Sequence, residues 1–128
     1  MSVLVLDSGG VTRLARRSQD SAAMIAAFVR DGAWPPLVPS VVLVECLSGR
    51  ERNDVLTNRF LKTCEIIEEI PQQLARRAAA LRASARRGSP VDAVVVAVAE
   101  PGGAVLSGDL ADLRALAAHA DDVIVLRA

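Results

Sequence analysis

Short apolar runs alternate along the chain with longer stretches in which apolar residues recur every three or four positions. A short apolar run bounded by turn residues is typical of a buried strand, whereas the longer period is typical of an amphipathic helix. The predicted strands are Val3–Leu6, a very short one around Leu37 and Val38, Glu65–Ile70, Ala104–Ser107 and Val123–Leu126.

The stretches between these runs are predicted as helices, because several carry recognisable start or stop residues. Ser40 and Ser89 are expected as N-caps, and Pro90 fits the first helical position. The predicted helices run from Ser8 or Gly9 to Arg17, from Asp20 or Ser21 to Gly32, from Ser40 to about Leu47, over residues 51–63, from Pro71 to near Gly88, over SPVDAVVVAVAE (residues 89–100) and over Asp109–Ala118.

Strands that alternate with helices in this way predict a parallel sheet with helices on both faces. The composition, 52% hydrophobic and 23% charged, is sufficient for one domain with its own core. No internal repeat, linker or low-complexity tract interrupts the pattern. We therefore expect a single domain over residues 1–128, an α/β/α sandwich with a central parallel sheet of about five strands.

Simple features of the sequence exclude other classes of protein. The two cysteines, Cys46 and Cys64, form no CxxC pair and are expected to be small buried residues rather than a disulfide. The N-terminus lacks the features of a signal peptide, and the apolar, uncharged run Ala93–Ala99 is far shorter than the roughly 20 residues that span a bilayer. We expect a soluble, cytoplasmic protein with no membrane partner.

Fifteen basic residues balance fifteen acidic ones, so net charge does not indicate a nucleic-acid partner. The distribution is uneven, however, because Lys62 is the only lysine and RRAAALRASARR, residues 76–87, holds five arginines and no acid. Arginine suits two-point recognition of phosphate. This segment is either a solvated helix face or a surface that contacts RNA phosphates. In the second case the contacts would come from Arg76, Arg77, Arg82, Arg86 and Arg87.

Four carboxylates are candidates for one site. In an open α/β sheet the ligand crevice lies beyond the carboxyl ends of the strands. Asp7 follows the first predicted strand at that edge, and Asp109, in the sequence SGD, follows the fourth. Glu45 in VVLVECL and Asp92 in the first turn of its helix are placed where they can join them.

Each aspartate also has a purely structural explanation. Asp7 is placed to cap the helix after its strand, and Asp92 lies three residues beyond Ser89, which is the spacing of a capping box. Asp109 and Asp112 repeat that spacing, so that one can cap the following helix and the other can return a hydrogen bond to the capping residue. Acids in a first turn also interact favourably with the helix dipole. Capping and a role in a site therefore both stay open for these residues.

Glu45 is expected to lie in a largely buried helix, where an isolated charge is very costly and needs a partner, either an arginine or a divalent cation. The chain has a single histidine, so a bound metal would be a hard ion held by oxygen, which favours Mg²⁺ or Mn²⁺. Four converging acids that hold one or two such ions would form a phosphodiester-cleaving site. The ions would neutralise the scissile phosphate and lower the pKa of a bound water.

Four stretches, in this order, resemble PIN-domain ribonucleases, and more narrowly the VapC-type toxins of bacterial toxin–antitoxin pairs. The stretches are VLVLDSG, VPSVVLVECLSG, SPVDAVVVAVA and AVLSGDLADLRALA, and the likeness extends from Val3 to Val125. Two turns differ from the family's pattern. DSGG stands where a hydroxyl-rich turn is more usual, and SGD stands where the middle residue is often larger.

The resemblance implies a PIN fold and Mg²⁺- or Mn²⁺-dependent cleavage of RNA. It implies Asp7, Glu45, Asp92 and Asp109 as the catalytic and metal-binding acids. Ser107, which matches the small hydroxyl residue before the last acid, Asp112 and Ser8 are supporting candidates. It also implies a homodimer, and neutralisation by a cognate VapB-type antitoxin whose C-terminal segment occupies or distorts the acidic pocket.

Two other functions are alternatives to a ribonuclease toxin. A phospho-receiver domain is also α/β, of similar length and acidic after its first strand. It needs a lysine beyond a late strand, however, and the only lysine here, Lys62, lies before the predicted strand that begins at Glu65. A catalytically silent PIN-like module would act only through a protein or RNA partner. The presence of all four acids argues against such a loss of chemistry.

Overall fold

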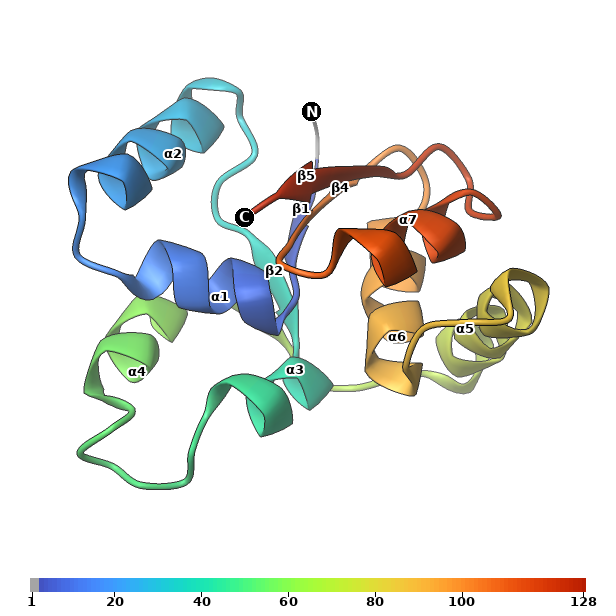
Figure 1. Ribbon diagram of the computed structural model, residues 1–128, viewed down its shortest axis with the longest axis horizontal. Helices are drawn as coiled ribbons and strands as arrows, with labels where there is room; N and C mark the ends of the chain where they lie inside the picture. The colour runs from blue at the N-terminus through green and yellow to red at the C-terminus, as the bar shows by residue number, and fades with distance from the viewer. Residues whose placement is uncertain (1–2) are drawn as a thin grey trace.

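A parallel sheet of five short strands forms the centre of the molecule in a computed structural model that describes residues 3–128 (Figure 1). The order across the sheet is β3-β2-β1-β4-β5, and each neighbouring pair is parallel. This arrangement confirms the predicted fold class. The strands are β1 (Leu4–Leu6), β2 (Leu37–Pro39), β3 (Glu65–Ile67), β4 (Ala104–Ser107) and β5 (Ile124–Arg127).

Helices cover both faces of the sheet. In Figure 1, α1, α2 and α4 lie on one side of the strands, α5, α6 and α7 lie on the other, and α3 lies below the carboxyl ends of the central strands. The helices are α1 (Ser8–Ala15), α2 (Gln19–Arg30), α3 (Ser40–Cys46), α4 (Val55–Leu61), α5 (Gln72–Ala85), α6 (Pro90–Ala99) and α7 (Leu110–Ala117).

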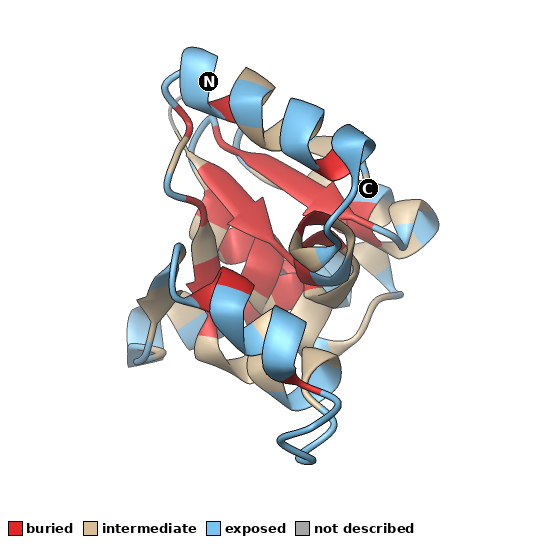
Figure 2. Cartoon of the chain, turned by 90° about the vertical axis from the view of Figure 1, so that its left-hand side faces the viewer, coloured by how far each residue is buried: buried red, intermediate tan, exposed pale blue. Residues whose placement is uncertain are grey.

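The core is built on the two central strands. Every residue of β1 and β4 is buried, and Val95 and Val96 of α6 are fully buried (Figure 2). Full burial of one such valine or leucine side chain stabilises the fold by about 1.5–3 kcal/mol. The rigid centre therefore lies where β1 and β4 run side by side, and both strands end at the same edge.

Two glycines allow α1 to begin very close to the end of β4. A Cβ atom on Gly9 would lie 2.6 Å from the backbone nitrogen of Gly108, and a Cβ on Gly10 would collide with the carbonyl oxygen of Leu106. Close packing therefore explains the two glycines of DSGG. They let the chain that leaves β1 turn directly against the chain that leaves β4.

The predicted helix over residues 51–63 is wrong at its start, because α4 begins only at Val55. The preceding loop is organised by the buried carboxylate of Asp54, whose Oδ1 accepts hydrogen bonds from the backbone N–H (2.9 Å) and hydroxyl (2.8 Å) of Ser48, and whose Oδ2 accepts one from the Gly49 N–H at 3.0 Å. These three bonds hold the loop in a non-helical form and lower the pKa of Asp54.

Other boundaries differ by a few residues. Ser40 is the first residue of α3 rather than its cap, because Pro39 occupies the cap position and the Ser40 hydroxyl bonds to the carbonyl of Glu68 instead. The strand predicted over Glu65–Ile70 stops at Ile67, since β2 offers only three residues to pair with it. In residues 3–128 no helix is long and apolar enough to cross a membrane. Both cysteines are free.

Candidate active site

A pocket of about 400 Å³ opens at the carboxyl edge of the sheet, between the ends of β1 and β4 and the starts of α6 and α7. It brings together all four acids predicted from the sequence, together with the supporting candidates Asp112 and Ser8. Its lining residues are Asp7, Ser8, Gly9, Glu45, Ser89, Asp92, Gly108, Asp109 and Asp112. Segments more than 100 positions apart in the chain therefore contribute to one acidic pocket.

Asp7 is the most firmly held of these acids. It caps α1, as predicted, because its Oδ1 accepts a hydrogen bond from the Gly10 N–H at 2.8 Å, while its Oδ2 accepts one from the hydroxyl of Ser107. Only 5% of the residue is exposed. Burial raises the pKa of Asp7 above its ordinary value, and the nearby charge of Asp92 adds to this, although the bonds from Ser107 and Gly10 act in the opposite direction.

The capping box predicted for α6 is present. The Asp92 N–H donates to the Ser89 hydroxyl at 3.0 Å, and the Ser89 N–H donates to Asp92 Oδ2 at 3.1 Å. The equivalent prediction for α7 is half right. Asp109 caps that helix by accepting from the Asp112 N–H at 3.5 Å, but Asp112 does not reciprocate.

Ser107 explains why Asp112 has no capping partner. The N–H of Asp109, to which a reciprocating Asp112 would bond, donates instead to the Ser107 hydroxyl oxygen at 2.8 Å. The fully buried Ser107 therefore accepts a bond from Asp109 and donates one to Asp7. It links the first and last acids of the pocket through a single hydroxyl group.

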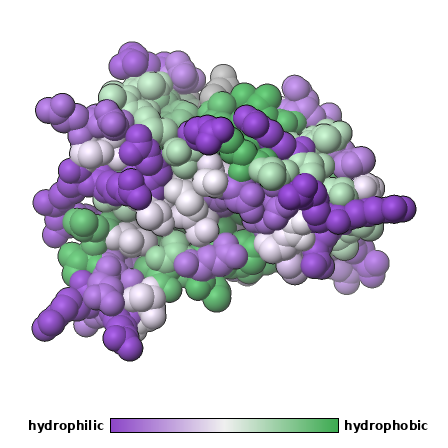
Figure 3. All heavy atoms as spheres, in the orientation of Figure 1, coloured by the Kyte–Doolittle hydropathy of each residue, from purple (hydrophilic) through white to green (hydrophobic). Residues whose placement is uncertain are grey.

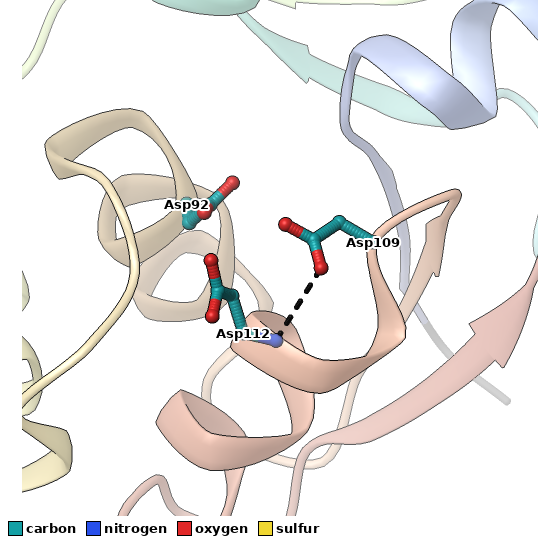
Figure 4. A group of neighbouring side chains, drawn as sticks. All are labelled: Asp92, Asp109 and Asp112. Atoms are coloured by element: carbon teal, nitrogen blue, oxygen red, sulfur yellow. Dashed lines mark hydrogen bonds between the residues drawn. The ribbon is translucent and has the colours of Figure 1, made fainter.

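Three of the acids lie close enough to share one cation. Asp92, Asp109 and Asp112 each offer a carboxylate oxygen, and these oxygens lie within 4.8 Å of one another (Figure 4). Figure 4 also shows that the three side chains come from the facing starts of α6 and α7. A set of carboxylate oxygens with no nitrogen or sulfur donor suits Mg²⁺ or Mn²⁺. The residues present therefore fit a hard divalent ion.

The fold of this chain is found in several solved structures, although no family model and no curated protein sequence matches it. DNA-bound VapBC from Salmonella typhimurium aligns with a TM-score of 0.71 and 15% identity, over 99% of this chain and 98% of that one. VapBC2 from Rickettsia felis, bound to a promoter DNA fragment, aligns with a TM-score of 0.71 and 14% identity over 98% of both chains. FitAcB from Neisseria gonorrhoeae aligns with a TM-score of 0.64 and 16% identity, over 97% of this chain and 96% of that one.

The chain has a PIN-domain fold. In this fold the acidic pocket lies at the carboxyl edge of the parallel sheet, which is where ligands bind in open α/β sheets.

Glu45 reaches the pocket for a different reason from the one predicted. It is exposed rather than buried, and its neighbour Val44 is 82% exposed. Helix α3 has only seven residues and turns one face to solvent, so apolar neighbours in the sequence did not imply burial. The prediction that Glu45 is buried and needs a partner is therefore wrong, but the residue does line the acidic pocket.

The five arginines of residues 76–87 separate into two groups. Arg77 is engaged with Glu100, through bonds of 2.8 and 2.6 Å, and Glu100 also accepts from the Asp121 N–H at 2.7 Å. The Arg77 hydrogen bond lowers the pKa of Glu100. Among residues 3–128, the Arg76 side chain hydrogen-bonds only to Gln72, near the start of α5. Both lie in the half of α5 farther from the acidic pocket.

The second group, Arg82, Arg86 and Arg87, lines a hollow at the end of α5. Arg87 donates from Nε to Asp112 Oδ1 at 2.6 Å, so one acid of the three-carboxylate cluster already has a cationic partner. The sequence reasoning missed this pair. Its only signal was the position of Arg87 two residues before the cap of α6, which brings the side chain to the edge of the pocket.

Proposed function

We propose that this PIN domain is a metal-dependent endoribonuclease that acts as the toxin of a toxin–antitoxin pair. The observation that carries the proposal is the convergence of five carboxylates from separate parts of the chain on one pocket. Such a concentration of negative charge repels itself unless cations compensate for it. The likeness of the fold to VapBC and FitAcB chains supports the same reading.

Asp7, Asp92 and Asp109 would hold Mg²⁺ or Mn²⁺, with Glu45 and Asp112 in the same pocket. When bound, the ion would neutralise charge on a phosphodiester and increase the acidity of a water molecule. The all-oxygen donor set and the short separation of the Asp92, Asp109 and Asp112 oxygens support Asp92 and Asp109 as ligands, and Asp7 is included because its carboxylate lines the same pocket.

The residues of the chain contribute orientation and proton transfer. The Gly10 N–H and the Ser107 hydroxyl fix both oxygens of Asp7, so that its carboxylate faces the pocket in one orientation. Glu45 is exposed at the rim, and among residues 3–128 no hydrogen bond or ion pair engages its carboxylate. Its oxygens are therefore available to accept a proton from a water molecule as a general base.

The test is cleavage of a single-stranded RNA by the purified protein with Mg²⁺, with Mn²⁺ and with a chelator. We expect metal-dependent cleavage that Asp92→Asn and Asp109→Asn each reduce by about 100-fold or more, since loss of a metal ligand costs at least as much as loss of its supporting contacts. Asp31→Asn, an exposed acid at the end of α2, is the matched control and should retain activity.

Cleavage that is equal in wild-type and Asp92→Asn protein would overturn the proposal. RNA binding without cleavage in any divalent ion would instead support the alternative weighed from the sequence, a catalytically silent PIN-like module that acts through a partner.

A cognate VapB-type antitoxin is the proposed protein partner, and an apolar groove between α1, α2 and α4 supports it. The groove has a volume of about 530 Å³ and is lined by Leu14, Ile25, Leu56 and Phe60, with arginines at its rim. A groove of this kind fits the apolar face of an amphipathic helix with acidic flanks. Co-purification of the antitoxin should be lost in Leu56→Asp and retained in Val29→Asp, since Val29 is also exposed but lies outside the groove.

A homodimer is proposed as well, through a second apolar hollow of about 340 Å³ between α3, α5 and α6. Ala75, Ala79, Val91 and Val94 line it, and small residues on α5 allow another chain to approach closely. Light scattering should give the mass of a dimer for the wild-type protein and that of a monomer for Ala79→Glu.

A further inference from the structure

Two hollows lined by arginines flank the acidic pocket. One, of about 340 Å³, is lined by Arg13 of α1 and by Arg16, which directly follows this helix, and it shares Gly9 and Gly108 with the acidic pocket. The two cavities therefore lie next to each other, on either side of these glycines. This places positive charge directly beside the end of β1.

The other hollow, of about 420 Å³, lies at the end of α5 and is lined by Arg82, Arg86 and Arg87. Arg87 joins it to the acidic pocket, because its Nε bonds to Asp112. The chain also passes directly from Gly88, in the wall of the hollow, to Ser89, in the wall of the acidic pocket.

The three cavities follow one another across a single face of the molecule. In Figure 1, α1 lies to one side of the starts of α6 and α7, and α5 lies to the other. Hydrophilic side chains are found on both flanks of this face (Figure 3). The order across the face is therefore basic, acidic and basic.

Most of the arginines in the two hollows are free to bind an anion. Among residues 3–128, the guanidinium groups of Arg13, Arg16 and Arg86 make no hydrogen bond and no ion pair, and that of Arg82 bonds only to the Gly88 carbonyl. Arg77, by contrast, is paired with Glu100 and also donates to the His119 carbonyl. The arginines that are available to bind a ligand therefore differ in position from Arg77, which links α5 to the end of α6.

We propose, building on the proposed ribonuclease function, that a single-stranded RNA binds across this face through its phosphate backbone. Its phosphates on one side of the cut are held by Arg13 and Arg16, and those on the other side by Arg82, Arg86 and Arg87. Arginine binds phosphate through two parallel hydrogen bonds. The flanking contacts would offset the repulsion between the backbone and the acidic pocket.

The scarcity of aromatic residues indicates that the backbone, rather than the bases, is recognised. Phe28 and Phe60 are buried, and Trp34 packs edge-on against Phe60 with ring centroids 6.2 Å apart. None of the three lines the acidic pocket or either arginine hollow. Stacking platforms, on which most single-strand binders depend, are thus missing from this face of the described chain.

The experiment compares three double variants that each remove two positive charges. They are Arg13→Gln with Arg16→Gln, Arg82→Gln with Arg86→Gln, and the control Arg30→Gln with Arg76→Gln, whose side chains are exposed and outside the three cavities. Binding of a 12-nucleotide oligouridine is measured by fluorescence anisotropy in Ca²⁺ across a salt series, with the RNA checked for integrity on a gel. Cleavage in Mg²⁺ and Mn²⁺ is measured in parallel.

We expect each hollow variant to weaken binding about tenfold at about 0.1 M salt, and to reduce the slope of log affinity against log salt by about 1.4, which is roughly 0.7 for each lost phosphate contact. The control should stay within about twofold of wild type. Equal losses in the control and the hollow variants would overturn the proposal, since only net charge would then matter. Equal affinity for a poly-glutamate peptide of the same charge would also overturn it.

The outcomes separate this proposal from the ribonuclease proposal. Metal-dependent cleavage whose KM and salt dependence are the same in all three double variants would overturn the RNA path alone. Binding that depends on both hollows, in a protein that cleaves no RNA in any metal, would support the path and reject the nuclease function.

Discussion

The hydroxyl of Ser107 donates a hydrogen bond to Asp7, across 100 positions of sequence and between the ends of β1 and β4. The same oxygen accepts a bond from the Asp109 N–H. One buried hydroxyl therefore sets the relative position of two acids that reach the pocket from different strands.

Ser107→Ala should destabilise the protein by about 1–3 kcal/mol, because it leaves the buried Asp7 oxygen and the Asp109 N–H without their partner. Urea unfolding measures this change. Ser84→Ala, at an exposed position on α5, is the control and should change stability by less than about 0.5 kcal/mol. Unfolding midpoints that are the same for Ser107→Ala and wild type would mean that the hydroxyl does not support the site.

Asp7→Asn should stabilise the metal-free protein at neutral pH while abolishing the proposed RNA cleavage. Burial raises the pKa of Asp7, so the folded state binds the proton more tightly than the unfolded state does. The stability associated with this proton is fully present below the ordinary value of 3.8 and is lost as pH rises through the raised pKa of the folded state. Asparagine keeps the cap on α1 and carries no charge.

Thermal unfolding with a chelator measures this effect between pH 3 and 8. The melting temperature of Asp7→Asn should exceed that of wild type by a few degrees at neutral pH, and the difference should disappear at the acid end. Asp20→Asn, an exposed acid in the first turn of α2, should show no such gain at neutral pH. A lower melting temperature for Asp7→Asn at every pH would contradict the sign of the effect.

Gly10→Ala should cost about 1–3 kcal/mol, because the new methyl group would collide with the backbone carbonyl of Leu106, which cannot move without disturbing β4. Gly108→Ala is a suitable control. Its Cβ would lie 3.6 Å from the Cα of Gly9, which is an ordinary contact. Circular dichroism during urea unfolding compares the two, and equal stabilities would show that α1 does not depend on this close approach.

Arg87→Gln should increase the affinity of the pocket for Mn²⁺ by several-fold, because it releases the Asp112 carboxylate from its 2.6 Å ion pair and leaves that negative charge available to a metal. Calorimetric titration measures the affinity. Arg76→Gln removes the same charge near the start of α5, away from the pocket, and should leave the affinity unchanged. Weaker Mn²⁺ binding in Arg87→Gln would indicate that the ion pair holds Asp112 in its binding position.

The sheet and most of the site could be predicted because both depend on local pattern. Apolar runs placed the strands, and parallel strands present their carboxyl ends at one edge, so Asp7 and Asp109 had to lie on the same rim. The capping box of Ser89 and Asp92 depends only on residues three apart in the sequence, and it was predicted correctly.

The features that escaped prediction depend on contacts between distant or irregular segments. The exposure of Glu45 follows from the brevity of α3, which the apolar sequence around it does not reveal. The pair between Arg87 and Asp112 requires a loop that turns at Gly88, where φ is +93°. The late start of α4 results from Asp54 bonding backward to a loop instead of extending its own helix.

Three helices, α1, α6 and α7, begin at the pocket; Asp7 and Asp109 cap α1 and α7, and Asp92 lies in the first turn of α6. A helix start carries the equivalent of roughly +0.5 elementary charge, so three of them partly neutralise the acids from within the protein. The side chains are consequently preorganised before any ion arrives. Removal of the metal should leave the domain folded and ready to be reloaded, which makes dialysis against a chelator a reversible way to turn the protein off.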